Sequence, residues 1–299
     1  MTSLLQSLQR LIAWHRSKMD QVAKVLPRGR TAAPFLAASV FASSCDGELN
    51  LTVDLATEPP ADIQIQQTSV LLQGVEFRRS GGDTQRLEFT DAEQLDLLTF
   101  VGTPDRLFTD EELPEGTYTG VRLLLETEES NESFIIDGTG AQRELTVGAG
   151  DYAEINFQVD EDDSLDEDLV LTLDLRQSLR FDEEEDRYVL TPIVRAVARE
   201  DAGGIRGAVT ACSTNTAVYL FQNEVEPDDI DGQDAEPYLT TFVSSFDTTY
   251  AFDFLPAGQY TLAVACDADE EDISVDDDLD FRGTTTVDLE DGEDLQEDL

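Results

Sequence analysis

After Cys45, the residues that could do chemistry are mainly carboxylates, because histidine and lysine are missing from that part of the chain. The single histidine is His15 and the last lysine is Lys24. This composition rules out Ser-His-Asp and Cys-His sites, histidine-ligated zinc, Schiff-base chemistry and a phosphate-loop lysine. Carboxylate pairs of the glycosidase kind remain, but a chain with 65 acidic residues contains such pairs by chance. We therefore predict that the protein is not an enzyme.

Acidic loops are candidates for a calcium site, since calcium prefers several oxygen ligands at short range. Asp-rich stretches occur at 160–168, 228–234 and 267–280, and none has the EF-hand spacing. The best candidate surrounds Gly232 and consists of Asp228, Asp229, Asp231 and Asp234. A hydrated acidic loop without an ion is the alternative that we favour. We thus expect no cofactor, with calcium as the exception to test.

Two cysteines follow the predicted export signal, and each ends an expected strand. In an exported chain, Cys212 and Cys266 are most simply a disulfide. Such a crosslink would stabilise the fold by about 4 kcal/mol on the chain-entropy model. Two buried free thiols are the alternative.

Sugar binding usually needs exposed aromatic faces. The only tryptophan is Trp14, and five tyrosines sit in strand patterns where a buried position is commoner: Tyr118, Tyr188, Tyr219, Tyr250 and Tyr260. Only analogy with the shape of other sandwiches supports a carbohydrate-binding function.

The charge of the chain is strongly negative. It has 19 Lys and Arg against 65 Asp and Glu, a net charge of −46 at pH 7. Disorder is one explanation of such a composition. We favour adaptation to high salt, because salt screens carboxylate repulsion, and we predict that folding requires high salt. A nucleic-acid partner is excluded, since a phosphate backbone would be repelled.

The first 45 residues indicate export. Residues 1–18 fit a basic amphipathic helix on a membrane, but we favour a start at Met19, because a complete export signal follows it. Basic residues precede an apolar run at 31–42 that is too short to span a bilayer. Ala42-Ser-Ser-Cys45 resembles the lipobox of bacterial lipoproteins, which implies lipidation of Cys45 and a membrane anchor. An ordinary signal peptide with a chance cysteine is the alternative.

One phrase occurs twice and organises the rest of the chain. Residues 113–119 read LPEGTYT and residues 255–261 read LPAGQYT. Proline fixes φ in a turn and glycine permits a left-handed backbone, so each copy predicts a turn that leads into a strand. Many short alternating stretches with Gly and Asp turns surround both copies, which favours an all-β fold of two β-sandwich domains, of the transthyretin-like or Ig-like Greek-key kind.

The predicted organisation has five parts. A leader spans 1–44, a first sandwich 45–199, a linker 200–204, a second sandwich 205–290, and an acidic tail 291–299 that we expect to be frayed.

Two stretches resemble known families. The LDLL run at 95–98, followed by LPEGTYTGVRL, resembles an exported bacterial domain of unknown function, numbered four-three-eight-two. The stretch from AVYLFQ through FLPAGQYTLAVAC to TTTVDL is similar to transthyretin-like and carboxypeptidase-regulatory-like modules. Neither resemblance implies a catalytic motif.

We therefore predict a non-catalytic lipoprotein of the cell envelope, on either the inner or the outer membrane. It would act as a structural or interaction module toward an unidentified envelope protein or glycan. A carbohydrate- or calcium-binding surface module is the alternative function.

Overall fold

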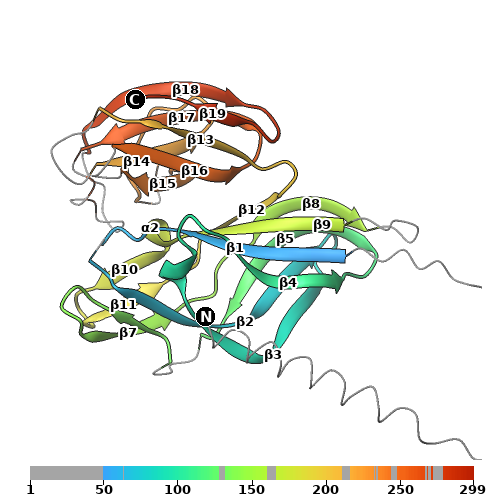
Figure 1. Ribbon diagram of the computed structural model, residues 1–299. Helices are drawn as coiled ribbons and strands as arrows, with labels where there is room; N and C mark the ends of the chain where they lie inside the picture. Colours follow the sequence, from blue (N-terminus) through green and yellow to red (C-terminus); the bar gives the residue numbers. More distant parts are fainter. Residues whose placement is uncertain are drawn as a thin grey trace, which may run out of the picture. The chain divides into compact units, whose positions relative to one another are not determined.

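The computed structural model describes residues 50–62, 64–127, 132–159, 166–210, 216–231, 233, 235–243, 248–266, 268, 271 and 279–299. All of them belong to one compact unit, Cys45–Leu299. These residues form an almost entirely β structure, as predicted (Figure 1). One hydrophobic core cluster lies in the first part of the chain and two lie in the second. Among the described residues, no helix has the length and apolar character needed to cross a membrane.

The first sandwich has a four-stranded and an eight-stranded sheet. The four-stranded order is β12-β9-β1-β4, from β1 (Asn50–Glu58), β4 (Asp105–Glu112), β9 (Asp166–Asp174) and β12 (Val194–Ala198). The eight-stranded sheet contains β2 (Gln67–Arg79), β3 (Thr84–Asp96), β5 (Gly116–Leu125), β6 (Phe134–Ile136), β7 (Gln142–Val147), β8 (Ala153–Val159), β10 (Leu179–Asp182) and β11 (Arg187–Leu190). Strand β2 pairs with β3 on one side, and with β6 and β5 through different segments.

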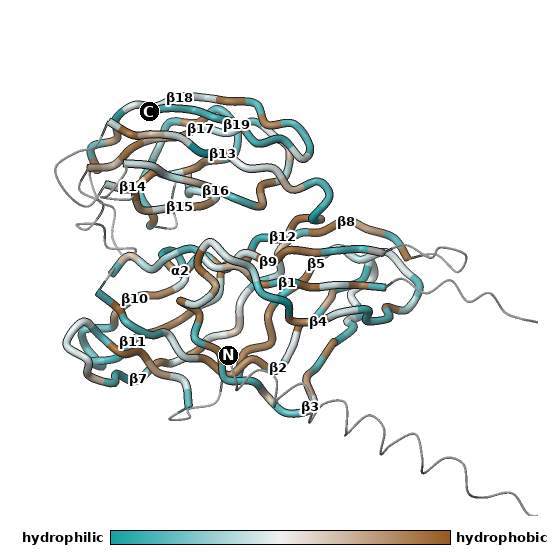
Figure 2. Tube along the Cα trace, viewed as in Figure 1, coloured by the Kyte–Doolittle hydropathy of each residue, from teal (hydrophilic) through white to brown (hydrophobic). Residues whose placement is uncertain are grey.

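The core of this sandwich follows from alternation along its strands. Leu51, Val53 and Leu55 of β1 are fully buried, as are Val75 and Phe77 of β2. Successive side chains of a strand point to opposite faces, so the residues between them face outward. Figure 2 shows hydrophobic residues recurring along β1 and β2.

Two short helical segments complete the first sandwich. Residues 91–100 contain both the end of a strand and a helical turn, because β3 continues to Asp96 and a 3₁₀ helix, η1, spans Leu97–Phe100. Asp96 caps η1 by accepting a hydrogen bond from the Leu98 amide. Helix α2 (Leu175–Ser178) follows β9 directly and is capped in the same way by Asp174.

The second sandwich has a three-stranded and a four-stranded sheet. The first has the order β16-β13-β19, from β13 (Gly203–Ala208), β16 (Thr249–Leu255) and β19 (Asp294–Gln296). The second has the order β15-β14-β17-β18, from β14 (Ala217–Gln222), β15 (Leu239–Phe242), β17 (Gly258–Ala265) and β18 (Phe281–Leu289). Strands β14 and β17 bury both faces, one against the three-stranded sheet's core and one in a separate cluster with Ile230 and Ala268.

The acidic tail is not frayed, which corrects our prediction. Residues Asp294–Gln296 form β19, parallel to β13, and the Leu299 amide donates to the Ala208 carbonyl at 2.9 Å. The physical reason lies in β13, where a Cβ on Gly207 would come within 1.6 Å of the Glu297 oxygen. Glycine there lets the tail backbone approach closely enough to pair. The predicted linker is also shorter than expected, since β13 begins at Gly203.

Both copies of the repeated phrase carry the chain from one sheet to the other. The first lies between β4 and β5 and the second between β16 and β17. In each copy the buried tyrosine hydroxyl donates to the proline carbonyl four residues earlier, Tyr118 to Pro114 and Tyr260 to Pro256, both at 2.6 Å. This is the tyrosine corner of Greek-key sandwiches.

One detail of the expected turn is wrong in the second copy. Gly116 has a positive φ of +146°, as we expected, but Gly258 does not have a positive φ. Instead Phe254, before the phrase, has a φ of +59°. The sharp bend of the second copy therefore falls before Leu255.

Candidate functional site

The cysteine predictions are only partly covered by the described residues. Cys266 lies at the end of β17 and is disulfide-bonded. Cys45 and Cys212 lie outside the described residues. The lipidation of Cys45 and the Cys212–Cys266 pairing therefore stay predictions.

The predicted calcium loop is also covered in part. Asp228, Asp229 and Asp231 are described, and Asp234 is not. Asp229 is buried, whereas the Asp231 carboxylate accepts from the backbone amide and side chain of Gln233 at 2.7 and 2.5 Å. Within the described part of the chain, no group of three or more potential ligands is close enough to hold a metal ion. The four-residue calcium site stays a prediction.

A cleft of about 640 Å³ opens at the hairpin of β10 and β11. Asp182 fixes the turn by accepting from the amides of Glu184 and Glu185, and Asp186 takes a positive φ of +52°. This turn pairs Phe181 directly with Tyr188. Their ring centroids are 4.9 Å apart.

The hydrophobic core reaches the cleft at Leu179, which lines it. Leu179 and Leu190, at the inner end of the hairpin, are 6% and 0% exposed. Two pairs further toward the turn, Tyr188 is half-buried and Phe181 is 43% exposed. Because alternate residues of a strand share a face, Phe181 and Tyr188 extend the apolar face into solvent.

The rim of the cleft is acidic. Its lining includes Asp62, Asp182, Glu183 and Glu184, and Arg180 is the one basic residue among the lining residues. Burial, together with the nearby carboxylates of Asp62 and Asp137, raises the pKa of the Tyr188 hydroxyl. The hydroxyl therefore stays protonated at neutral pH, although Arg143 offsets part of the rise in its pKa.

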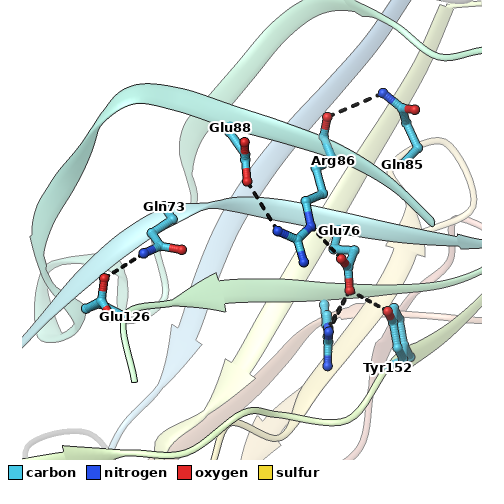
Figure 3. A network of polar contacts seen from close by, with 8 residues as sticks. Gln73, Glu76, Gln85, Arg86, Glu88, Glu126 and Tyr152 are labelled. Atoms are coloured by element: carbon cyan, nitrogen blue, oxygen red, sulfur yellow. Dashed lines mark hydrogen bonds and ion pairs between the residues drawn. The ribbon is translucent and has the colours of Figure 1, made fainter. Parts of the chain in front are cut away.

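A separate polar network lies on the outer face of the eight-stranded sheet (Figure 3). We call Glu76, Arg86, Arg122, Tyr152 and Arg78 the Glu76 network. The buried Glu76 carboxylate accepts from Arg86 Nε at 2.6 Å, Arg122 Nη2 at 2.6 Å and the Tyr152 hydroxyl at 2.5 Å. Burial alone would raise the pKa of Glu76, but these three hydrogen bonds outweigh it and lower the pKa to about 2.

Strand register explains why the network forms. Glu76 on β2 lies opposite Arg86 on β3 and opposite Arg122 on β5. Tyr152 enters from the start of β8, and the guanidinium groups of Arg78 and Arg122 lie 4.7 and 4.6 Å from its ring centre. The Glu76 carboxylate is thus bound by arginines from both neighbouring strands and by Tyr152.

The two sandwiches are joined by a buried arginine. Arg176 of α2 is 1% exposed and donates from Nε to Glu271 at 2.8 Å and from Nη2 to the Tyr219 hydroxyl at 2.9 Å. Its guanidinium lies 4.9 Å from the Phe242 ring centre. Burial by itself would lower the pKa of Arg176, but Tyr219 and Glu271 raise it. The neighbouring Gln177 side chain donates to the Pro237 carbonyl at 3.1 Å.

Sequence reasoning missed the cleft. It placed Tyr188 among tyrosines expected in strand patterns, and Tyr118, Tyr219, Tyr250 and Tyr260 are indeed buried. Phe181 was not singled out, although the sequence 181–188, FDEEEDRY, places two aromatic residues around an acidic turn. That spacing predicts a hairpin with paired rings, but not their exposure.

A family model matches most of the first sandwich. Residues 47–192 match the family model described as Domain of unknown function (DUF4382). The predicted resemblance of the first region is therefore confirmed. The DUF4382 match ends just before β12, which returns to the four-stranded sheet. The transthyretin-like resemblance of the second region stays a prediction. No curated protein matches the chain.

Solved structures are similar only at a low level. The minor pilin GBS52 of Streptococcus agalactiae is 12% identical, with 83% of this chain and 94% of that chain covered, at a TM-score of 0.21. A putative adhesin from Bacteroides ovatus ATCC 8483 is 11% identical, with 91% and 94% covered, at a TM-score of 0.21. The Bacillus anthracis TIE protein is 9% identical at a TM-score of 0.21, with 84% of this chain covered but only 34% of that chain. Likeness at these scores carries no functional argument.

Proposed function

We propose that this protein is a non-catalytic lipoprotein of the cell envelope that acts as a structural or interaction module. One observation carries the proposal: five buried charged side chains bind other parts of the protein itself. This holds for Asp54, Glu76, Asp137, Asp174 and Arg176. Catalytic acids and bases are instead held in clefts facing a substrate.

Each of these groups has a visible structural task. Asp54 on β1 accepts from Arg106 at 3.2 Å and also pairs with Arg199. Asp137 accepts from the Thr139 side chain and backbone at 2.6 and 2.9 Å and from Arg143 at 2.8 Å. These hydrogen bonds fix the turn between β6 and β7 and lower the pKa of the Asp137 carboxyl. These charges stabilise turns, strands and the junction between the two sandwiches.

The anchor is tested by Cys45→Ser. Cells grown with an alkyne fatty acid should label the wild-type protein, which should sediment with membranes. The Cys45→Ser variant should be unlabelled and soluble in the envelope fraction, whereas Ser44→Ala should behave as the wild type. Equal labelling of Cys45→Ser and wild type would contradict lipidation at Cys45.

The interaction function is tested by photo-crosslinking in intact cells. Glu88 and Glu154 are exposed on the first sandwich, and a photoreactive residue at either position should give a discrete adduct with one envelope component. Equivalent probes at the buried Val75 and Leu171 serve as controls and should give none. Failure of every exposed probe to form an adduct would contradict an interaction module.

The alternative is a carbohydrate- or calcium-binding surface module. The partly exposed aromatic pair Phe181 and Tyr188 supports this alternative, which the sequence alone supported only by analogy. A glycan array and calorimetry with calcium in high salt test this alternative, and silence in both favours the interaction module.

A further inference from the structure

Exposed large apolar side chains are rare among the described residues, and Phe181 is one of them. Across the described residues, the large hydrophobic side chains that are exposed are Val101 at 38% and Phe181 at 43%. An exposed aromatic ring in a cleft is a marker of binding, since leaving it in water forfeits the free energy of burial. Phe181 is therefore the leading candidate for contact with a partner.

The chemistry of the cleft favours a cation. Its lining includes two aromatic rings and the carboxylates of Asp62, Glu183 and Glu184, which outnumber its one basic residue, Arg180. Glu271 also lines the cleft, but its carboxylate is already bound by Arg176. Aromatic faces attract cations, and carboxylates neutralise them. An anionic ligand would be repelled by the same rim.

Arginine guanidinium groups already lie over other aromatic rings of the protein. Guanidinium groups lie over Tyr152 at 4.6 and 4.7 Å, over Tyr238 at 4.9 Å and over Phe242 at 4.9 Å. In the described part of the chain, no arginine of the protein is placed over Phe181 or Tyr188 in this way. A planar guanidinium stacks on such rings better than a lysine ammonium does.

We propose that the cleft at the β10–β11 hairpin binds an exposed arginine of a partner protein. The guanidinium stacks on Phe181 and Tyr188, and Asp62, Glu183 and Glu184 neutralise its charge. This inference rests on the proposed interaction function and names the chemistry of its partner. Stacking persists in high salt, where the attraction between the separate charges is screened.

A peptide titration tests the inference. The full-length protein in mild detergent is titrated with acetyl-Gly-Arg-Gly-amide at low and high NaCl, and the aromatic NMR signals are followed. The matched peptide has citrulline, which keeps the planar shape but has no charge. We expect the arginine peptide to bind at least about fivefold more tightly, because it alone makes a charged contact.

Variants locate the binding. Phe181→Leu keeps an apolar side chain but removes the ring and should weaken binding roughly two- to fivefold at either salt concentration. The double change Glu183→Gln and Glu184→Gln should weaken binding mainly at low salt. Val101→Ala, and the exposed pair Glu224→Gln and Glu226→Gln, should leave binding unchanged.

Several results would overturn the inference. These are equal binding of both peptides, no binding of either, or an unchanged affinity in Phe181→Leu with an unaltered unfolding transition. Tighter binding of a neutral oligosaccharide that depends on Phe181 would assign the cleft to a glycan instead. Crosslinking at Glu88 or Glu154 does not depend on the cleft, so it can succeed when the arginine site fails.

Discussion

The two strands that follow the repeated phrase begin alike and are used differently. Both β5 and β17 start at a tyrosine corner with a 2.6 Å hydrogen bond to a proline carbonyl. The outer face of β5 carries Arg122 in the solvent-facing Glu76 network. The outer face of β17 carries Ala263 and Ala265, which are completely buried beside Tyr219 and the inserted Arg176. The corner therefore fixes how the strand enters the sandwich, and its outer side chains are free to serve another purpose.

The largest expected effect is the loss of stability when the buried Arg176 is removed, compared with removal of the exposed Arg86. Arg176→Ala should lower the free energy of unfolding by about 3–5 kcal/mol, because it leaves Glu271 buried without its cation. Arg86→Ala should cost under about 1 kcal/mol, because Arg86 is 53% exposed and Glu76 keeps Arg122 and Tyr152. Denaturant unfolding in molar NaCl measures both, and equal losses would remove the distinction between the two outer faces.

Low pH should weaken the Glu76 network. The pKa of Glu76 is about 2 in the folded protein against an ordinary value of 4.5, so its stabilisation is complete above pH 4.5 and is lost as the pH falls through 2. We expect Glu76→Gln to cost roughly 2 kcal/mol at pH 7 and much less at pH 2. The difference in unfolding free energy between the two proteins is measured at fixed NaCl. A difference independent of pH would contradict the lowered pKa.

The smallest effect tests the similarity of the two corners. Tyr118→Phe and Tyr260→Phe each remove one hydrogen bond and retain the buried ring, so each should cost about 1 kcal/mol. Thermal unfolding of both variants gives the comparison. Clearly unequal losses would show that the two hydrogen bonds do not do equivalent work.

Much of the fold follows from local patterns. Alternation along 49–55 predicts β1, and the Gly-Gly turn at 81–82 predicts the hairpin of β2 and β3, both of which the structure contains. The prediction of a frayed tail at 291–299 was wrong. It rested on the low apolar content of the tail, and no local pattern reveals that Gly207 leaves room for the tail backbone. Pairing between residues 90 positions apart depends on steric fit in the folded state.

The candidate site was less predictable than the fold. FDEEEDRY at 181–188 encodes a hairpin, but the exposure of Phe181 depends on which distant segments pack against that hairpin. The buried Arg176 was not predicted either, because α2 spans only four residues and its partner Glu271 is 95 residues away.

The sequence by itself determined the all-β class, the repeated strand-entry turn and the absence of histidine and lysine after Cys45, since composition and short-range periodicity carry this information. Only the tertiary structure decided which outer faces are covered, which charges are paired, and which aromatic residue stays open. Those outcomes depend on contacts between distant segments, whose geometry is set when the sheets pack.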